Sequence, residues 1–259
     1  MTIYWSKLTD STNLDAMREK GSAEDKTVWA AEFQSAGRGQ RGNRWESEEG
    51  KNLMFSILFK PKDFPATNQF HISMAVASGV ADYLASKGIK ASVKWPNDIY
   101  SGDRKICGML IENTLSGDRL AACIAGIGLN VNQRIFPADL PNPTSLVLEL
   151  ERSGCTTASA PDIHTELPSL LKSIFSRYES VTEPEGRKKM SEHYMSIMYR
   201  LGEKHLFEET EYFKDRNAPG PRRFEGIIRG IEEDTSRLIV EHPDGNTVRY
   251  FFKEIKFII

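Results

Sequence analysis

Two apolar segments constrain the fold of this chain more than any other feature. Residues 27–33 are rich in β-branched and aromatic side chains, and residues 52–59 are almost continuously apolar. Apolar runs of this length without alternation are typical of strands that are buried on both faces of a sheet. Both segments are therefore predicted to be central strands.

Further strands and helices follow from the same patterns. Strands are predicted at residues 2–8, 90–95, 105–114 and 119–131, and helices at about 12–20, 69–87, 144–151, 162–179 and 184–198. The helix at 69–87 carries apolar residues at helical spacing and ends at Gly88. The predicted fold class is α+β, with a mixed sheet flanked by helices.

The pattern changes near Gly202, where short β runs separated by turns begin. The chain is therefore predicted to form a larger domain over residues 1–200 and a small all-β domain over residues 201–259. Residues 214–223 contain several Gly, Pro and Asn residues and are predicted to form a long exposed loop.

Charge and cysteine usage exclude some classes of protein. The 259 residues include 34 Lys and Arg and 36 Asp and Glu, a formal charge of −2, which argues against wrapping nucleic acid or anionic membrane. No apolar stretch reaches the roughly 18 residues that span a bilayer. Cys107, Cys123 and Cys155 form no CxxC pair, and no signal segment begins the chain. We therefore expect a cytoplasmic protein without a disulfide framework.

Side chains for metal or covalent catalysis are not arranged in a known spacing. The five histidines form no paired metal-ligand motif, and neither a GxSxG elbow nor a recognisable cysteine nucleophile occurs. If the chain is an enzyme, it is expected to work without a covalent intermediate.

The segment Gly37–Trp45 (GRGQRGNRW) places three glycines and three arginines between two buried strands. Glycine lets backbone amides approach an anion, and guanidinium groups suit phosphate. The segment does not match a P-loop. A phosphate site and a solvated or RNA-binding loop remain equally open on composition. Trp45 could cover a ligand or anchor the loop.

A second cluster follows a strand end at Lys94–Asp98 (KWPND). Asn97 and Asp98 could belong to a ligand site or to an Asx turn. Lys105 begins the apolar strand KICGMLIE. It could be a snorkelling residue at the edge of the sheet or a phosphate ligand.

The strand Cys123–Asn132 separates its residues into two faces. Alternation places Cys123, Ala125, Ile127, Leu129 and Val131 on one face, and Gly126, Gly128, Asn130 and Asn132 on the other. Glycine inside a strand often marks the close approach of a ligand or of another backbone. Both a ligand and another backbone are consistent with this glycine face.

Together, the motifs GRGQRGNRW, KWPND with RKICGMLIE, and GIGLNVN resemble the catalytic domain of biotin protein ligases, in the short form without an N-terminal DNA-binding domain. The resemblance runs from about residue 10 to residue 132 and implies a class II synthetase-like or lipoate-ligase-like catalytic domain. Residues 201–259 are similar to the family's SH3-like C-terminal β-barrel. Because the STN motif arrives at Ser11, no repressor role and no nucleic-acid partner are expected.

The resemblance also implies an activity. A member of this family uses ATP to convert biotin to biotinyl-5′-AMP, and then transfers the biotinyl group to a lysine of a biotin carboxyl carrier protein. The biotin-binding residues that it implies are Ser11, Thr12, Asn13, Gln34, Gly37, Arg38, Trp45, Lys105, Gly108 and Gly126. Ser11, Thr12 and Gln34 would bind the ureido ring.

The same resemblance assigns the catalytic and nucleotide residues. Arg38 and Lys105 are expected at the carboxylate and α-phosphate, with Arg41 at the departing phosphates and Asp98 either holding Mg²⁺ or orienting Lys105. The ATP-binding residues are expected to be Arg38, Gln40, Arg41, Trp45, Lys105, Asn130 and Phe136, with Asn130 at adenine. Relatives often have Arg at the position of Gln40, so retention of the acyl-adenylate is expected to depend more on Arg38, Arg41 and Lys105.

Two other functions remain open at this point. A lipoate- or octanoate-protein ligase shares the general fold, and a non-enzymatic RNA- or protein-binding module would use the Gly-Arg loop as a contact. The expected partner is a biotin carboxyl carrier protein of acetyl-CoA carboxylase or of another biotin-dependent carboxylase. The ligase is expected to act as a monomer or homodimer and away from membranes.

Overall fold

The computed structural model describes residues 1–154, 160–213, 222–232 and 235–259. The chain divides into two compact units, Met1–Val93 with Asn97–Ile197, and Met198–Ile259 with Lys94–Pro96. The main division lies a few residues before the predicted boundary at 200/201. The second unit also includes Lys94–Pro96, which the sequence prediction assigned to the first domain. Cys155 and residues 214–221 of the predicted loop lie outside the described residues.

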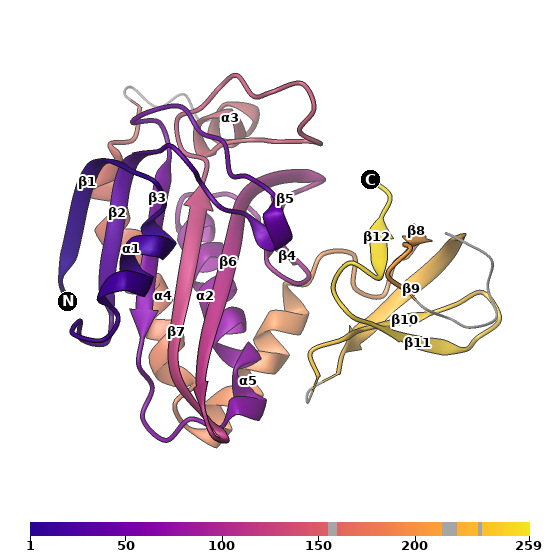
Figure 1. Cartoon of the computed structure of the whole chain (residues 1–259). Helices are drawn as coiled ribbons and strands as arrows, with labels where there is room; N and C mark the ends of the chain where they lie inside the picture. The colour runs from indigo at the N-terminus through magenta and orange to yellow at the C-terminus, as the bar shows by residue number, and fades with distance from the viewer. Residues whose placement is uncertain (155–159, 214–221, 233–234) are drawn as a thin grey trace. The chain divides into compact units, whose positions relative to one another are not determined.

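The first unit is built on a seven-stranded sheet (Figure 1). Its strands are β1 (Ile3–Thr9), β2 (Thr27–Gln34), β3 (Leu53–Phe59), β4 (Ser92–Lys94), β5 (Asp98–Ser101), β6 (Arg104–Ser116) and β7 (Arg119–Leu129), in the order β1-β2-β3-β7-β6-β5-β4. Strand β1 is parallel to β2, whereas β2–β3, β3–β7, β6–β7 and β5–β6 are antiparallel. The prediction of a mixed sheet is therefore confirmed.

The two apolar segments occupy the interior of this sheet. Every residue of β3 is buried, as are the first five residues of β2. The sequence prediction missed β5, which is only four residues long and pairs with β6 across a tight turn. Gly102 in this turn has φ +55°, a conformation that glycine adopts without steric cost.

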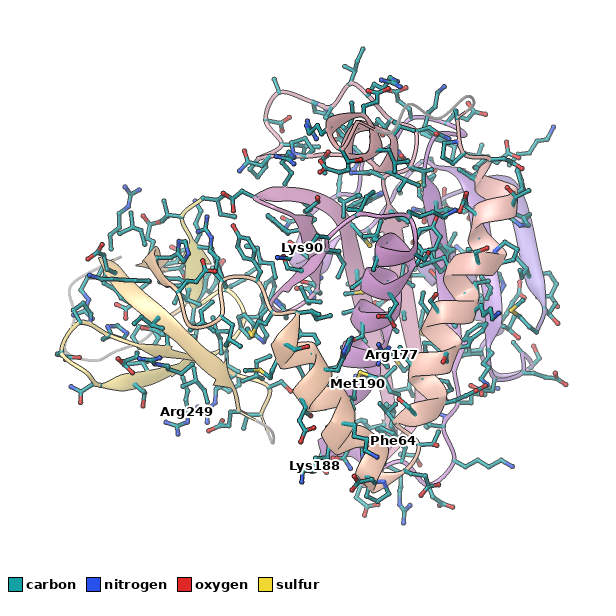
Figure 2. The ribbon with its side chains drawn as sticks, turned by 180° about the vertical axis from the view of Figure 1, so that it is seen from behind. Phe64, Lys90, Arg177, Lys188, Met190 and Arg249 are labelled. Atoms are coloured by element: carbon teal, nitrogen blue, oxygen red, sulfur yellow. The ribbon has the colours of Figure 1, made fainter. Side chains whose placement is uncertain are left out.

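Helices cover both faces of the sheet. The short α1 (Thr12–Glu19) lies on one face, and α2 (Phe70–Ser86), α4 (Ile163–Ser180) and α5 (Pro184–Ser196) lie on the other, which faces the viewer in Figure 2. The remaining helix is α3 (Leu146–Arg152). Helices α2 and α4 approach closely at Gly79, where an added Cβ would lie 2.5 Å from the Cα of Ile174.

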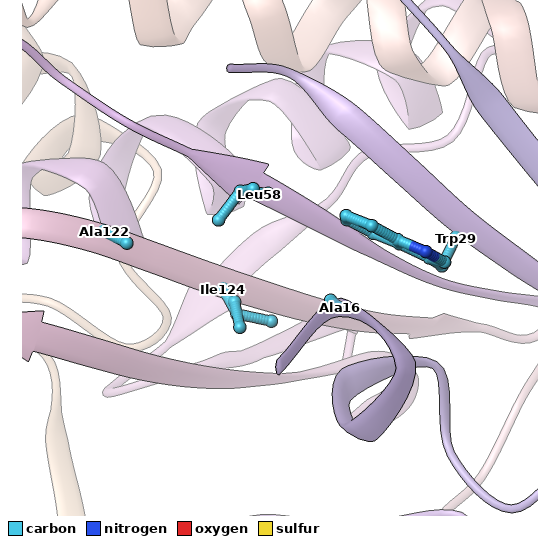
Figure 3. Packing of buried hydrophobic residues seen from close by; sticks show 5 residues of the cluster. All are labelled: Ala16, Trp29, Leu58, Ala122 and Ile124. Atoms are coloured by element: carbon cyan, nitrogen blue, oxygen red, sulfur yellow. The ribbon is translucent and has the colours of Figure 1, made fainter. Parts of the chain in front are cut away.

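The face beneath α1 carries a small apolar cluster (Figure 3). Its buried members are Ala16, Trp29, Leu58, Ala122 and Ile124. Ala122 and Ile124 belong to β7, and the next residues of β7 on this face are Gly126 and Gly128. Apolar packing thus fixes α1 at one end of β7 and leaves the glycine end for other groups.

The second unit contains a five-stranded antiparallel sheet in the order β11-β10-β9-β8-β12. Its strands are β8 (Lys204–Glu209), β9 (Arg223–Ile231), β10 (Leu238–Glu241), β11 (Thr247–Tyr250) and β12 (Ile255–Phe257). The small C-terminal β domain is therefore confirmed, while its SH3-like class stays a prediction. The apolar and β-branched residues 247–258 form two strands, β11 and β12, between which Lys253 has φ +75°.

A chain of polar groups, buried from His242 to Glu209, crosses this second sheet. Arg222 Nη2 lies 3.2 Å from His242 Nδ1, His242 Nε2 lies 2.7 Å from the Tyr250 hydroxyl, and that hydroxyl donates to Glu209 over 2.6 Å. Because arginine can only donate, Nδ1 accepts and the proton of a neutral imidazole must sit on Nε2. Burial lowers the pKa of His242, opposed by Glu209 and Asp244 and assisted by Arg222.

The stability of the second unit is expected to fall as the pH drops below 6.5, the ordinary pKa of histidine. The folded state favours neutral His242, so the unfolded state binds more protons and stability rises with pH until both states are neutral. Hydrogen exchange of β9 and β10 in the whole protein measures this change.

A His242→Gln variant should lose this pH dependence, whereas His205→Gln in the same unit should keep it. Protection of β9 and β10 that stays constant between about pH 7.5 and about pH 5.5 would contradict the assignment.

Candidate ligand-binding site

The floor of the candidate site is bare backbone on β6 and β7. Gly108 of β6 is directly opposite Gly128 of β7, and Gly126 of β7 is opposite Ser56 of β3. The three glycines therefore share one face of the sheet, the face that also carries α1. A strip without side chains crosses two neighbouring strands.

Side chains of the protein itself lie directly on this strip. A Cβ on Gly126 would come within 2.8 Å of Asn13 Cγ, and one on Gly128 would come within 2.6 Å of Trp45 Nε1. A Cβ on Gly108 would lie 2.8 Å from Trp45 Cζ3. The glycines are thus needed for the close approach of Asn13 and Trp45. The sequence alone predicted that either a ligand or another backbone would approach these glycines.

The start of α1 contributes a chain of buried polar groups. Thr12 donates its backbone N–H to Gln34 Oε1 over 2.8 Å, and its hydroxyl lies 2.7 Å from Ser56 Oγ. Ser56 donates to Asn13 Oδ1 over 2.5 Å, and Asn13 Nδ2 donates to Glu112 Oε2 over 2.9 Å. Three predicted residues, Thr12, Asn13 and Gln34, are therefore brought together. Ser11, also buried, precedes them as the residue before α1.

The Gly-Arg segment forms a short hairpin-like loop over the same face. Its backbone is closed by the bridge between Arg38 and Arg44 and by the Trp45 N–H, which donates to the Gly37 carbonyl over 3.0 Å. A 3₁₀ turn at Gln40–Gly42 forms the tip. The Arg38 guanidinium donates to both oxygens of Glu112, over 3.0 and 3.2 Å.

Lys105 forms the second cationic point of the site. Its Nζ lies 2.7 Å from Asp98 Oδ1 and 5.8 Å from the centre of the Trp45 ring. The side chain is about one third exposed, at 32%. Lys105 therefore stands beside the glycine floor, and Asp98 orients it from the neighbouring strand β5.

The KWPND segment is divided between two roles. Asp98 reaches the site, whereas Asn97 is buried and donates its amide to the Met109 carbonyl of β6. Trp95 is buried in the second unit and donates its indole N–H to the Ser236 carbonyl. The side-chain amide of Asn97 therefore binds a strand of the sheet.

The proposed adenine residues lie at the end of β7. Asn130 is buried and donates its side-chain amide to the Thr144 carbonyl over 2.9 Å, which ties it to the segment before α3. Phe136 is half-buried in the connection between β7 and α3. The backbone of Arg41 lies in the 3₁₀ turn, but its side chain is outside the described part of the chain.

The segment before α3 is anchored by a buried carboxylate. Glu149 accepts hydrogen bonds from Ser101, Arg104 and Thr144 at 2.5–2.9 Å. Burial raises the pKa of Glu149, but these bonds, led by that from Arg104, outweigh it and bring the pKa to about 2. Glu149 therefore stays ionised and holds Thr144, the partner of Asn130, in place.

Two buried polar atoms of the loop have no hydrogen-bond partner among the described residues. They are Trp45 Nε1 and Gln40 Oε1. Buried polar groups are usually satisfied by protein, water or ligand. The loop thus holds one donor and one acceptor for which the described residues supply no partner.

Sequence reasoning missed two residues of this site. Ser56 is the only polar residue of β3, LMFSILF, and Glu112 ends the apolar run of KICGMLIE. Two signals in the sequence could have indicated these residues. Ser56 is a serine within an apolar strand, and Glu112 is a carboxylate two residues beyond Leu110. Only the register of β3, β6 and β7 shows that both residues adjoin the glycine face.

The described residues contain neither a cluster of metal ligands nor an accessible thiol at this site. Among the described residues, no set of three or more His, Cys, Asp or Glu side chains is placed to hold a metal ion. Cys107 and Cys123 are free and buried, and burial raises the pKa of Cys123 to about 12. In the part of the chain that the structure describes, no helix is long and apolar enough to cross a membrane.

The fold and the site define a ligand-binding α+β domain, in which a Gly-Arg loop and a lysine surround a glycine floor. Residues 5–130 match the Biotin/lipoate A/B protein ligase family, so this part of the chain is a domain of that family.

Individual relatives agree with this assignment. The chain is 34% identical over 234 residues to the bifunctional ligase/repressor BirA of Escherichia coli, covering 89% of this chain and 66% of that protein. It is 28% identical to the biotin–[acetyl-CoA-carboxylase] ligase of Paracoccus denitrificans, covering 93% and 94% of the two chains. The structure of the Aquifex aeolicus biotin protein ligase in complex with biotin and ATP matches with a TM-score of 0.75 and 28% identity, over 98% and 97% of the chains. The bacterial BirA relatives are longer, and the chain spans 42–66% of their length.

A side chain at Gly128 is expected to displace Trp45. In Gly128→Ala, the added Cβ would meet the indole, so the ring must move, and overpacking of this kind costs about 1–3 kcal/mol. The indole N–H signal of Trp45, assigned with Trp45→Phe, measures the displacement, and urea unfolding measures the cost.

Gly21→Ala is the matched control, because an added Cβ there meets no atom within 4 Å. An unshifted Trp45 signal in Gly128→Ala would show that the indole does not lie on this glycine.

Proposed function

We propose that this protein is an ATP-dependent biotin–protein ligase, which forms biotinyl-5′-AMP and transfers the biotinyl group to a lysine of a biotin carboxyl carrier protein. The observation that carries the proposal is the pairing of two cations, Arg38 and Lys105, with an indole on a glycine floor. A ligand that combines an apolar ring system with a carboxylate suits such a site. The family assignment supports the same conclusion.

The relatives support the choice of substrates and partner. The Aquifex aeolicus structure is described as a complex with biotin and ATP, and the Paracoccus denitrificans relative is named a biotin–[acetyl-CoA-carboxylase] ligase. We therefore propose biotin and ATP as the substrates and a carrier domain of a biotin-dependent carboxylase as the partner.

Both nucleophiles of this reaction come from the substrates. A carboxylate oxygen of biotin attacks the α-phosphorus of ATP, and the new O–P bond forms as the bond to pyrophosphate breaks. The ε-amine of the carrier lysine then attacks the acyl carbon, and AMP leaves as the amide forms. The residues of the chain therefore bind, orient and neutralise charge, which agrees with the absence of a nucleophile motif.

The two cations are proposed to act on the reacting groups. Arg38 can form forked hydrogen bonds to the biotin carboxylate and the α-phosphate, and Lys105 adds a point charge beside them. Arg41 is proposed to neutralise the departing phosphates. The Lys105–Asp98 pair at 2.7 Å favours the role of Asp98 in orienting Lys105.

The remaining site residues are proposed to bind the two substrates. The ureido ring is assigned to Ser11, Thr12, Asn13 and Gln34, the rings and tail of biotin to Gly37, Trp45, Gly108 and Gly126, and the nucleotide to Gln40, Trp45, Asn130 and Phe136. The buried hydroxyl and amide groups of Thr12 and Asn13 suit a polar ring, because a buried amide or urea needs partners.

Mg²⁺ is proposed to arrive with the nucleotide. Mg²⁺ usually keeps several waters and binds one or two carboxylates together with substrate phosphates. The donor set fits this description, since Asp98 is the carboxylate beside Lys105 and no larger ligand cluster occurs among the described residues. When bound, the ion would neutralise phosphate charge.

A lipoate- or octanoate-protein ligase is the second candidate, because the matching family includes lipoate ligases. An RNA- or protein-binding module is the non-enzymatic alternative. A cytoplasmic location, a monomeric or homodimeric state and the absence of a nucleic-acid partner stay predictions.

ATP–pyrophosphate exchange with different acids tests the function. We expect exchange with biotin and not with lipoate, octanoate or no acid, because only the matching carboxylate is activated. Exchange with lipoate alone would show that lipoate, and not biotin, is the substrate. Salt-sensitive RNA binding without exchange would favour the binding module.

Replacing either cation is expected to slow adenylation strongly without unfolding the protein. Hydrogen bonds to charged groups contribute about 1.5–3 kcal/mol, so Arg38→Ala and Lys105→Ala should each lower the exchange rate roughly 10-fold to 100-fold. Both side chains are partly exposed, at 40% and 32%, so the fold should persist, which circular dichroism checks.

Lys87→Ala is the matched control for these variants. Lys87 is 31% exposed and paired with Glu166 at 2.6 Å, but it ends α2 on the opposite face of the sheet. Wild-type exchange in Lys105→Ala or Arg38→Ala would refute the corresponding role.

A further inference from the structure

Glu112 lies where three segments of the site meet. It belongs to β6, and its carboxylate accepts hydrogen bonds from Asn13 at the start of α1 and from Arg38 in the Gly-Arg loop. Oε2 receives both Asn13 Nδ2 at 2.9 Å and Arg38 Nη1 at 3.2 Å, and Oε1 receives Arg38 Nη2 at 3.0 Å. Both oxygens of the carboxylate are therefore used within the site.

The contact with Arg38 has a defined geometry. Two parallel N–H···O bonds between a guanidinium and a carboxylate fix the plane of the guanidinium as well as its position. Arg38 projects from a loop and its side chain is 40% exposed, whereas Glu112 sits inside a long strand opposite Ile124 of β7. Glu112 is thus the rigid partner and Arg38 the group that it orients.

The contact with Asn13 connects this pair to the buried part of the site. Asn13 is 3% exposed, lies against Gly126 and accepts a hydrogen bond from Ser56. An exposed ion pair alone contributes little. Here the carboxylate is also held by a buried amide, so its orientation is set by the core and not by solvent.

We propose that Glu112 is a positioning residue, which holds the Arg38 guanidinium in the plane in which its remaining N–H groups meet the acid group of the ligand. The identity of that acid rests on the proposed function, whereas the orientation of Arg38 does not. Glu112 makes no bond to the reacting atoms in this role and acts through Arg38.

A simple charge argument predicts the opposite effect. If Glu112 only neutralised Arg38, its removal would free a positive charge and strengthen the binding of an anionic ligand. If Glu112 positions Arg38, its removal weakens that binding although the site becomes more positive. The sign of the change therefore separates the two roles.

Glu112→Gln is the informative variant. Its amide oxygen can still accept from Asn13, but its NH₂ group faces the N–H groups of Arg38 and breaks the fork. We expect the Kd for biotin to rise roughly 10-fold by calorimetry, while the Kd for neutral biotin amide changes less than about two-fold. In an Arg38→Ala background, Glu112→Gln should have no further effect, because the group that it positions is gone.

Asp82→Asn is the matched control. Asp82 also forms a two-bond pair with an arginine, Arg177, but these residues belong to α2 and α4, which cover the face of the sheet opposite to α1. This variant should bind both ligands as the wild type does. Thermal unfolding of each variant checks that the fold is retained.

The guanidinium ¹⁵N signals of Arg38 give a readout that needs no ligand. They should show restricted rotation in the wild type and averaging in Glu112→Gln. Tighter biotin binding, equal losses for biotin and its amide, an undiminished loss in the Arg38→Ala background, or unchanged Arg38 signals would each overturn the positioning role. A wild-type protein that binds no biotin would overturn the proposed function, and the Arg38 signals would still decide the role of Glu112.

Discussion

Gly126 and Gly128 leave the backbone of β7 uncovered on one face of the sheet, and Gly108 does the same on β6. The site depends on this close approach, because Asn13 and Trp45 lie where the glycine side chains would otherwise be. Packing in a protein interior leaves no spare volume, so even a methyl group on Gly128 must move the indole. The apolar cluster under α1 works together with this floor, since Ala122 and Ile124 on the same strand fix the helix whose first turn carries Thr12 and Asn13.

The charges of the site are held in pairs. Arg38 is bound by Glu112 of β6, and Lys105 is bound by Asp98 of β5. Each cation is thereby oriented by a carboxylate on a strand, which reduces the reorganisation needed when an anion arrives. This arrangement suits a reaction in which substrates supply the nucleophiles and the protein supplies position and charge.

Much of the first unit could be predicted because its signals are local. The continuous apolar run of β3, the glycine alternation of β7 and the spacing of α2 each follow from neighbouring residues. The failures have a common cause. Strand β5 has four residues and is stabilised by pairing with β6, and Ser56 and Glu112 join the site through strand register. Trp95 belongs to the KWPND segment, which the sequence indicates as a candidate ligand site, but it is buried in the second unit. None of these contacts is visible in residue spacing.

The sequence by itself determined which strands are buried, which strand presents a glycine face, and which loop carries the arginines. It did so because side-chain alternation, glycine content and charge are properties of short segments. Only the tertiary structure decided what lies on the glycines and what holds the cations. Asn13, Arg38 and Glu112 come from three segments far apart in the chain, and hydrogen bonds with a narrow range of distance and angle form between them only after the sheet has set the register of its strands.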